Sequence, residues 1–173
     1  KKVKKLKAGD RVYLSGYIYT ARDQAHQRLY NLIKNKKKLP IDLKDAVIYY
    51  TGPAPAKPGQ IIGACGPTTS YRMDKFTPTL LKNGLNGMIG KGPRSEKVKK
   101  SIKENNAVYF AATGGAAALL SKTIIESKVI AYPELNTEAI RLLKVNKFPL
   151  VVINDSYGND LYEKGQKKYN ELR

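Results

Sequence analysis

The sequence is poor in side chains that bind metals or carry redox chemistry. It has one cysteine, Cys65, one histidine, His26, and no tryptophan in 173 residues. A single cysteine excludes a disulfide within the chain. It also excludes an iron–sulfur cluster held by this chain alone, because such a cluster needs several thiolates. Cys65 follows the mainly apolar residues 61–64, which predicts a buried thiol that packs as a small hydrophobic group.

Long apolar segments are absent as well. No run approaches the roughly 20 residues that a membrane-spanning helix requires, and no secretory signal is recognisable. A chain that begins at Lys1 without methionine is expected to have been trimmed or to lack residues. With 42% hydrophobic and 27% charged residues, the composition is typical of a soluble globular protein. We expect residues 1–173 to form a single cytoplasmic domain with one sizeable core.

Acidic residues are scarce: 14 Asp and Glu stand against 32 Lys and Arg, giving a formal net charge of +18. Such an excess raises the possibility of a basic nucleic-acid-binding module. However, the basic clusters at residues 1–5 and 35–38 carry no interleaved aromatic residues that could stack on bases. A solvated basic face is the alternative that we favour, and its field would still attract dianionic substrates.

Hydrophobic patterning predicts alternating strands and helices, hence an α/β fold with a mixed sheet flanked by helices. Strands are expected at residues 11–15, 46–50, 60–65, 87–89, 107–112, 128–131 and 150–153. Helices are expected at residues 22–37, 77–83, 95–105, 137–145 and from Leu161 onward, with a further helix start in G-G-A-A-A-L-L at 114–120.

The segment G-P-T-T-S-Y-R-M-D at residues 66–74 gathers hydroxyls and a guanidinium just after a predicted buried strand. Its polar candidates, together with the glycine that opens the segment, are Gly66, Thr68, Thr69, Ser70 and Arg72. Hydroxyls and free backbone N–H groups could cradle an anion, and an arginine can grip a carboxylate through two parallel hydrogen bonds. The hydroxyls could equally cap a following helix, and local physics leaves both interpretations open.

A second polar segment, T-A-R-D-Q-A-H at residues 20–26, spans the start of the first predicted helix and precedes its apolar pattern Leu29, Leu32, Ile33. Thr20 with Asp23 three residues later fits a capping box, which would place Arg22 and Asp23 in the first helical turn. His26 lies four residues after Arg22 and therefore shares its helix face. Taken singly, these residues also fit a solvated helix start and a packed histidine.

Seven motifs in one order carry a family resemblance. They are G-D-R-V-Y-L-S-G (9–16), T-A-R-D-Q-A-H (20–26), Y-Y-T-G-P (49–53), G-P-T-T-S-Y-R-M-D (66–74), I-G-K-G (89–92), G-G-A-A-A-L-L (114–120) and D-S-Y-G-N (155–159). With them the chain resembles the beta subunit, or C-terminal domain, of the class I iron–sulfur fumarate hydratases and L-tartrate dehydratases. The resemblance implies a swivelling β/β/α domain that closes over a cluster held by a partner.

The resemblance also implies a function and partners. It implies the beta subunit of a heteromeric hydro-lyase that interconverts fumarate and (S)-malate, with L-tartrate dehydration as the alternative. The cofactor would be a [4Fe–4S] cluster held by the alpha subunit and not by this chain, which would hold no metal. The partners would be that alpha subunit and a small dicarboxylate, in a hetero-oligomer that could also self-associate, with no membrane or nucleic acid involved.

The site residues implied by the resemblance have distinct roles. Arg22, Arg72 and Lys91 would bind substrate carboxylates, and Thr68 would transfer the C–H proton. His26 would be a second acid or base, or would orient Arg22 and Asp23, while Gly66, Thr69 and Ser70 would support the site.

Three positions depart from the family pattern: Tyr71 replaces a small residue, Pro93 replaces a glycine, and Tyr157 replaces a histidine. A tyrosine at 71 could narrow the pocket and alter substrate choice, whereas position 157 is expected to affect local structure.

Overall fold

The computed structural model describes residues 3–113 and 115–171, in which six strands form one mixed sheet. The strands are β1 (Arg11–Thr20), β2 (Val47–Tyr49), β3 (Gly87–Gly90), β4 (Val108–Ala111), β5 (Ile124–Ala131) and β6 (Ile140–Asn154). The helices are α1 (Asp23–Lys34), α2 (Thr77–Lys82), α3 (Glu96–Glu104), α4 (Ala117–Ser121) and α5 (Leu161–Asn170), with short 3₁₀ turns η1 (Val3–Lys5), η2 (Ser70–Met73) and η3 (Pro133–Glu138). The predicted fold class, α/β with a mixed sheet flanked by helices, is confirmed.

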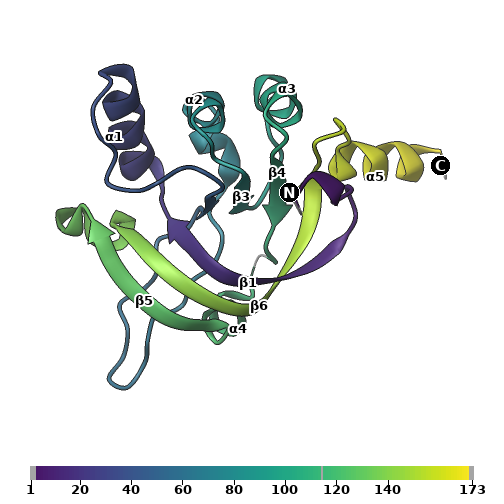
Figure 1. Ribbon diagram of the computed structural model, residues 1–173. Coiled ribbons are helices and arrows are strands. Elements are labelled where there is room, and N and C mark those ends of the chain that lie inside the picture. The colour runs from purple at the N-terminus through teal and green to yellow at the C-terminus, as the bar shows by residue number, and fades with distance from the viewer. Residues whose placement is uncertain (1–2, 114, 172–173) are drawn as a thin grey trace.

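Strand order is β1-β2-β3-β4-β6-β5, and β1 also pairs with β6. Neighbours among β1 to β4 are parallel, whereas β6 runs antiparallel to β1, β4 and β5. Because β6 is 15 residues long, it reaches both β1 and β4 and closes the sheet on itself. In Figure 1, β1, β5 and β6 form a curved arm on one side, and α1, α2 and α3 stand in a row on the other.

Side chains on alternate sides of β2 belong to two separate cores. Ile48 packs under the row of helices with Leu29 and Leu80. Tyr49 faces the opposite way and packs with Phe148 and Leu143 of the arm. Alternation with period two sends successive side chains to opposite faces, and covering both faces explains why the parallel strands read as continuous apolar runs.

The prediction of a strand at residues 60–65 is wrong. This segment has bends but no strand. Two backbone bonds of 2.9 Å join it to the preceding loop, from the Ala54 amide to the Ala64 carbonyl and from the Gln60 amide to the Lys57 carbonyl. The facing segment is rich in proline, which has no N–H to offer a ladder. A Cβ at Gly63 would lie 2.4 Å from the Ala54 carbonyl oxygen, so the two segments approach too closely for a side chain.

The prediction of a helix at residues 137–145 is also wrong, because Ile140 begins β6. The apolar spacing of E-A-I-R-L-L-K suits a helix, but here β1 and β5 hydrogen-bond to the segment from both sides. Pairing and burial of Ile140, Leu143 and Val145 override the local helix preference. The remaining predicted strands and helices are present, although β1 extends to Thr20 and β5 begins at Ile124.

Two further features complete the fold. The G-G-A-A-A-L-L motif does lead into a helix, α4, but its first residue, Gly114, lies outside the described residues.

Within the described ranges, no helix is long and apolar enough to cross a bilayer.

Candidate active site

The candidate residues gather where the parallel strands end. β1 ends at Thr20 just before Arg22, and β3 ends at Gly90 just before Lys91. The Thr68 amide donates to the Tyr50 carbonyl, which directly follows β2, at 2.7 Å. The carboxyl ends of parallel strands meet at one edge of a sheet, which is where α/β proteins bind ligands.

Arg72 and Asp23 join the two polar segments predicted from the sequence. Nε of Arg72 donates to Oδ1 of Asp23 at 3.0 Å, and Nη2 lies 2.9 Å from Oδ2. The Arg72 side chain remains 42% exposed, so part of the guanidinium faces solvent. The structure therefore places Arg72 at the site but directs two of its nitrogens toward Asp23.

Arg22 lies between the start of α1 and the loop that follows β2. Its Nη2 is 3.8 Å from Oε1 of Glu138, and its Nε is 3.8 Å from Oδ2 of Asp23. A Cβ at Gly52 would lie 2.7 Å from Nη1 of Arg22, so a side chain at position 52 would displace the guanidinium from its observed place. Sequence reasoning missed Glu138 and Gly52, although Gly52 stands inside the Y-Y-T-G-P motif.

The capping box predicted from Thr20 and Asp23 is wrong. Thr20 belongs to β1, and its Oγ1 donates to the Ala139 carbonyl at 3.2 Å and accepts from the Arg141 amide at 3.0 Å. The amide of Gln24 in the first turn of α1 donates instead to Glu138 at 2.9 Å. An acid from a distant turn thus satisfies the helix start, which no local sequence pattern could reveal.

Neither local interpretation of Thr68 holds in full. The amides of Thr68 and Ser70 donate to the carbonyls of Tyr50 and Lys91, so these two N–H groups are not free to cradle an anion. Thr69 precedes η2 without a side-chain cap bond. The Thr68 hydroxyl, only partly buried, has no hydrogen-bond partner in the described part of the chain, which leaves it free for a ligand.

Lys91 is tied to the Thr68 loop by its backbone, and its side chain is exposed. Its amide donates to the Thr68 carbonyl at 3.2 Å, and its carbonyl accepts from the Ser70 amide at 2.9 Å. A Cβ at Gly90 would come within 2.0 Å of Ser70 Oγ, so glycine is required for this close approach. No acid among residues 3–113 and 115–171 pairs with the Lys91 ammonium, which is therefore available to an anion.

His26 lies behind the site rather than on its surface. The ring is wholly buried and packs edge-on against Tyr50 and face-on against Phe76. Nδ1 lies 2.8 Å from the Arg22 carbonyl, which can only accept, so Nδ1 carries the hydrogen. Burial lowers the pKa of His26 from 6.5 to about 4. His26 is therefore neutral at neutral pH, and it fixes the backbone of Arg22.

Cys65 is buried, as the sequence predicts. Its Sγ lies 3.5 Å from Thr51 Oγ1, and burial raises the pKa of the thiol from 9.0 to about 11. Thiolates bind iron–sulfur clusters, whereas a buried neutral thiol does not. No three His, Cys, Asp or Glu side chains within the described ranges are arranged to hold a metal ion, so these residues do not fit a cluster.

The three positions that depart from the family pattern lie at the surface. Tyr71 is 63% exposed beside Arg72, and Tyr157 is 55% exposed; Pro93 is exposed two residues after Lys91. The backbone around Tyr157 is held by Asp155, whose carboxylate accepts from the amides of Tyr157 and Asn159 at 3.0 and 2.9 Å. Tyr71 is thus the departure best placed to touch a ligand.

Together, the mixed sheet and its edge, where Arg72 and Lys91 reach solvent near Thr68, define an α/β domain with a candidate anion site. A family model described as "Fumarase C-terminus" matches residues 1–165. The chain belongs to this family, and the resemblance drawn from its motifs is confirmed.

Similar proteins carry two kinds of name. The chain is 42% identical to a Methanocaldococcus jannaschii protein named "Putative L(+)-tartrate dehydratase subunit beta", over 99% of this chain and 91% of that protein. It is 39% identical to the Escherichia coli K12 "Fumarate hydratase class I, anaerobic" over 88% of this chain. It is 37% identical to the Leishmania major "Fumarate hydratase 2" over 90% of this chain. The chain spans only 28% of each of these two fumarate hydratases.

Proposed function

We propose that this chain is the beta subunit of a hydro-lyase that interconverts fumarate and (S)-malate, with L-tartrate as the alternative substrate. The observation that carries the proposal is that the segments bearing Arg22, Thr68 and Lys91 lie at one edge of the sheet, where β1 to β3 end. The beta-subunit name of the Methanocaldococcus jannaschii relative supports a separate subunit, and the hydratase and dehydratase names of the relatives support the reaction class.

Three cations would bind the substrate carboxylates. Lys91 offers an ammonium that pairs with no acid in the described part of the chain. Arg22 and Arg72 offer guanidinium nitrogens that Asp23 and Glu138 occupy only in part. Charges held in place before the substrate arrives need no reorganisation when negative charge builds on a carboxylate during the reaction. These residues would therefore bind the dicarboxylate and stabilise the charge beside the carbon that loses its proton.

Thr68 would transfer the proton of the substrate C–H bond. In the dehydration direction its Oγ1 would accept the proton from the carbon next to a carboxylate, and in hydration it would return it. A free threonine hydroxyl is a weak base, so the charges of Lys91 and Arg72 would have to stabilise its alkoxide. His26, neutral and buried, would act by fixing Arg22 rather than by exchanging protons with the substrate.

A [4Fe–4S] cluster would belong to the alpha subunit, since Cys65 and the acidic residues within the described ranges do not form a ligand set. The exposed cations at the sheet edge suit a site that is completed by a second protein. The partner in our proposal is therefore a cysteine-bearing alpha subunit in a hetero-oligomer.

The test is to co-express the chain with a cysteine-rich candidate alpha subunit from the same genome and purify the complex without oxygen. Hydration of fumarate and dehydration of L-tartrate are then measured side by side, with each subunit alone as control. We expect turnover of one dicarboxylate by the complex only. A folded, cluster-loaded complex that turns over neither compound overturns the proposed function, and the preferred compound decides between the two substrates.

A further inference from the structure

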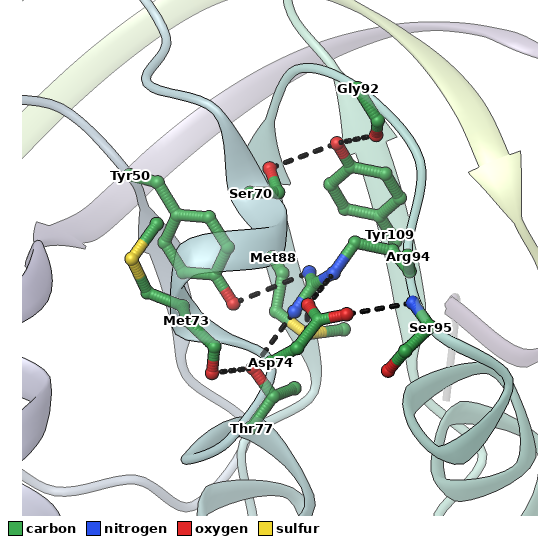
Figure 2. Close-up of polar contacts among 10 residues, drawn as sticks. All are labelled: Tyr50, Ser70, Met73, Asp74, Thr77, Met88, Gly92, Arg94, Ser95 and Tyr109. Carbon is green, nitrogen blue, oxygen red and sulfur yellow. Dashed lines mark hydrogen bonds and ion pairs between the residues drawn. The ribbon is translucent and has the colours of Figure 1, made fainter.

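Arg94 is a buried arginine that sequence reasoning missed. It follows Lys91 by three residues, and its side chain has no exposed area. Nε donates to Oδ1 of Asp74 at 2.7 Å, and Nη2 donates to Oγ1 of Thr77 at 2.8 Å. Figure 2 shows the guanidinium at the centre of these contacts. It joins the segment that carries Thr68 and Arg72 to the segment that carries Lys91.

Two tyrosine rings enclose the same guanidinium. Its central carbon lies 4.9 Å from the ring centre of Tyr109 and 5.4 Å from that of Tyr50, within cation–π range. The Tyr109 hydroxyl lies 2.9 Å from Ser70 Oγ and 2.8 Å from the Gly92 carbonyl. Ser70 belongs to one site segment and Gly92 to the other, so Tyr109 is a second link between them.

Asp74 completes the network. While Oδ1 accepts from Arg94, Oδ2 accepts from the Ser95 amide at 2.7 Å. This bond holds the residue that precedes α3, so the carboxylate binds the second segment at two successive residues. The main-chain bonds between Thr68, Ser70 and Lys91 join the same two segments at the site itself. The two segments are therefore joined at two places, by main-chain bonds at the site and by Asp74 at Arg94 and Ser95.

Such a network is better suited to fixing geometry than to adding stability. A buried ion pair gains little over well-packed apolar side chains, because both charges must leave water. Each donor must nevertheless meet its acceptor, which allows few arrangements of the chain. The guanidinium stays charged, because Tyr50 and Asp74 raise the pKa of Arg94 despite the opposing effect of burial.

We propose that Arg94 is a positioning residue that holds Thr68 and Lys91 in register through Asp74 and Tyr109. The proposal rests on the proposed function for its catalytic consequence, but its structural part concerns this chain alone. The side chains of Arg94 and Tyr109 have no exposed area, so both would act through the loops rather than on the substrate.

The structural part is tested by amide hydrogen exchange on the full chain. Arg94→Lys keeps the charge, but one ammonium cannot reproduce the planar fork that contacts Asp74 and Thr77. We expect the amides of Ser70 and Lys91 to exchange about tenfold faster, as expected for weakening on the order of one hydrogen bond. Amides in β1 and β6 should keep their rates. Unchanged exchange at Ser70 and Lys91 overturns the proposal.

Val145→Ala is the matched control, since Val145 is buried in the other core, on the arm. Val145→Ala should lower the free energy of unfolding of the whole chain. The exchange rates of the Ser70 and Lys91 amides should stay as in the parent, because local structure protects them. If Arg94→Lys does not fold, Thr77→Val replaces it, because that near-isosteric change removes the acceptor of Nη2 and otherwise only the bond that the Thr77 hydroxyl donates to the Met73 carbonyl at 2.9 Å. Equal loop exchange in Thr77→Val and in the parent then overturns the proposal.

The catalytic part is tested in the complex with the alpha subunit. We expect Arg94→Lys to lower kcat by about tenfold or more with a smaller change in KM, because misplaced groups lose transition-state contacts first. Val145→Ala should keep the parent kcat per folded complex. Equal kcat in both variants overturns the positioning role. A parent complex without hydro-lyase activity refutes the proposed function instead, and exchange alone then decides the role of Arg94.

Discussion

Asp23 and Arg72 meet face to face across the two polar segments, with Nε at 3.0 Å from Oδ1 and Nη2 at 2.9 Å from Oδ2. This contact aligns the guanidinium before any substrate arrives. It also means that a substrate carboxylate must either use the remaining nitrogen edge or compete with Asp23. The fork geometry, more than the positive charge, is therefore what Arg72 would contribute.

Replacing Arg72 with lysine separates geometry from charge. Arg72→Lys keeps the charge but loses the planar fork, so kcat/KM of the complex should fall by about 100-fold or more. The control is the double change of Lys4 and Lys5 to glutamine, which removes two charges far along the chain from the site and should have little effect. Equal losses in both proteins would favour a general electrostatic role, as would be expected of a diffuse basic surface.

Thr68 gives a sharper test, because the structure removes its capping role. Its hydroxyl makes no cap bond to any residue that the structure describes, so Thr68→Ala should change the free energy of unfolding by no more than about 0.5 kcal/mol. Turnover should nevertheless be almost abolished while substrate binding persists, and Thr68→Ser should keep partial activity. The measurement is exchange of the substrate C–H hydrogen with deuterated water. Thr79→Ala on α2 is the matched control.

Parent-like exchange in Thr68→Ala would show that Thr68 is not the base. The role would then fall to a residue of the partner, since the structure buries His26 away from the surface.

Stability should depend on pH through His26. Its pKa is about 4 in the folded chain and 6.5 when unfolded, so the unfolded state binds more protons between these values. The contribution is therefore fully present above about pH 6.5 and is lost as pH falls toward 4, by at most roughly 3 kcal/mol. Urea unfolding between these pH values, compared with His26→Asn, measures it.

The asparagine variant removes the titrating group but can still donate to the Arg22 carbonyl. Its stability should vary less with pH than that of the parent. Parallel stability–pH curves for the two proteins would contradict the buried, neutral state of His26.

The sequence predicts the central parallel strands well, because both of their faces are covered. Val47–Tyr49, Gly87–Gly90 and Val108–Ala111 are short apolar runs bounded by turn residues, and few other structures suit such runs. The segment from Ile140 is different. Its strand state depends on pairing with β1, more than a hundred residues away, and local preference favours a helix.

In the site, too, local sequence predicts some residues, whereas others depend on distant parts of the chain. Motifs predict Arg22, Thr68, Arg72 and Lys91 together, and the structure brings their segments to one edge. The residues that hold them could not be predicted, because their partners are distant: Glu138 satisfies the start of α1, and Arg94 is buried although arginine is usually exposed. Side-chain contacts of this kind depend on the folded backbone and leave no local pattern.

The last prediction concerns the cysteine. Because burial raises the pKa of Cys65 to about 11, the thiol is protonated at neutral pH and is a poor ligand and nucleophile. The chain alone, incubated without oxygen with iron and sulfide, should therefore stay colourless and inactive. Cys65→Ala should cost about 1 kcal/mol of stability or somewhat more through lost packing. It should leave the cluster content and activity of the complex with the alpha subunit unchanged. Visible absorption by a cluster on the isolated parent chain, absent in Cys65→Ala, would show that this subunit holds iron itself and would refute the assignment of the cluster to its partner.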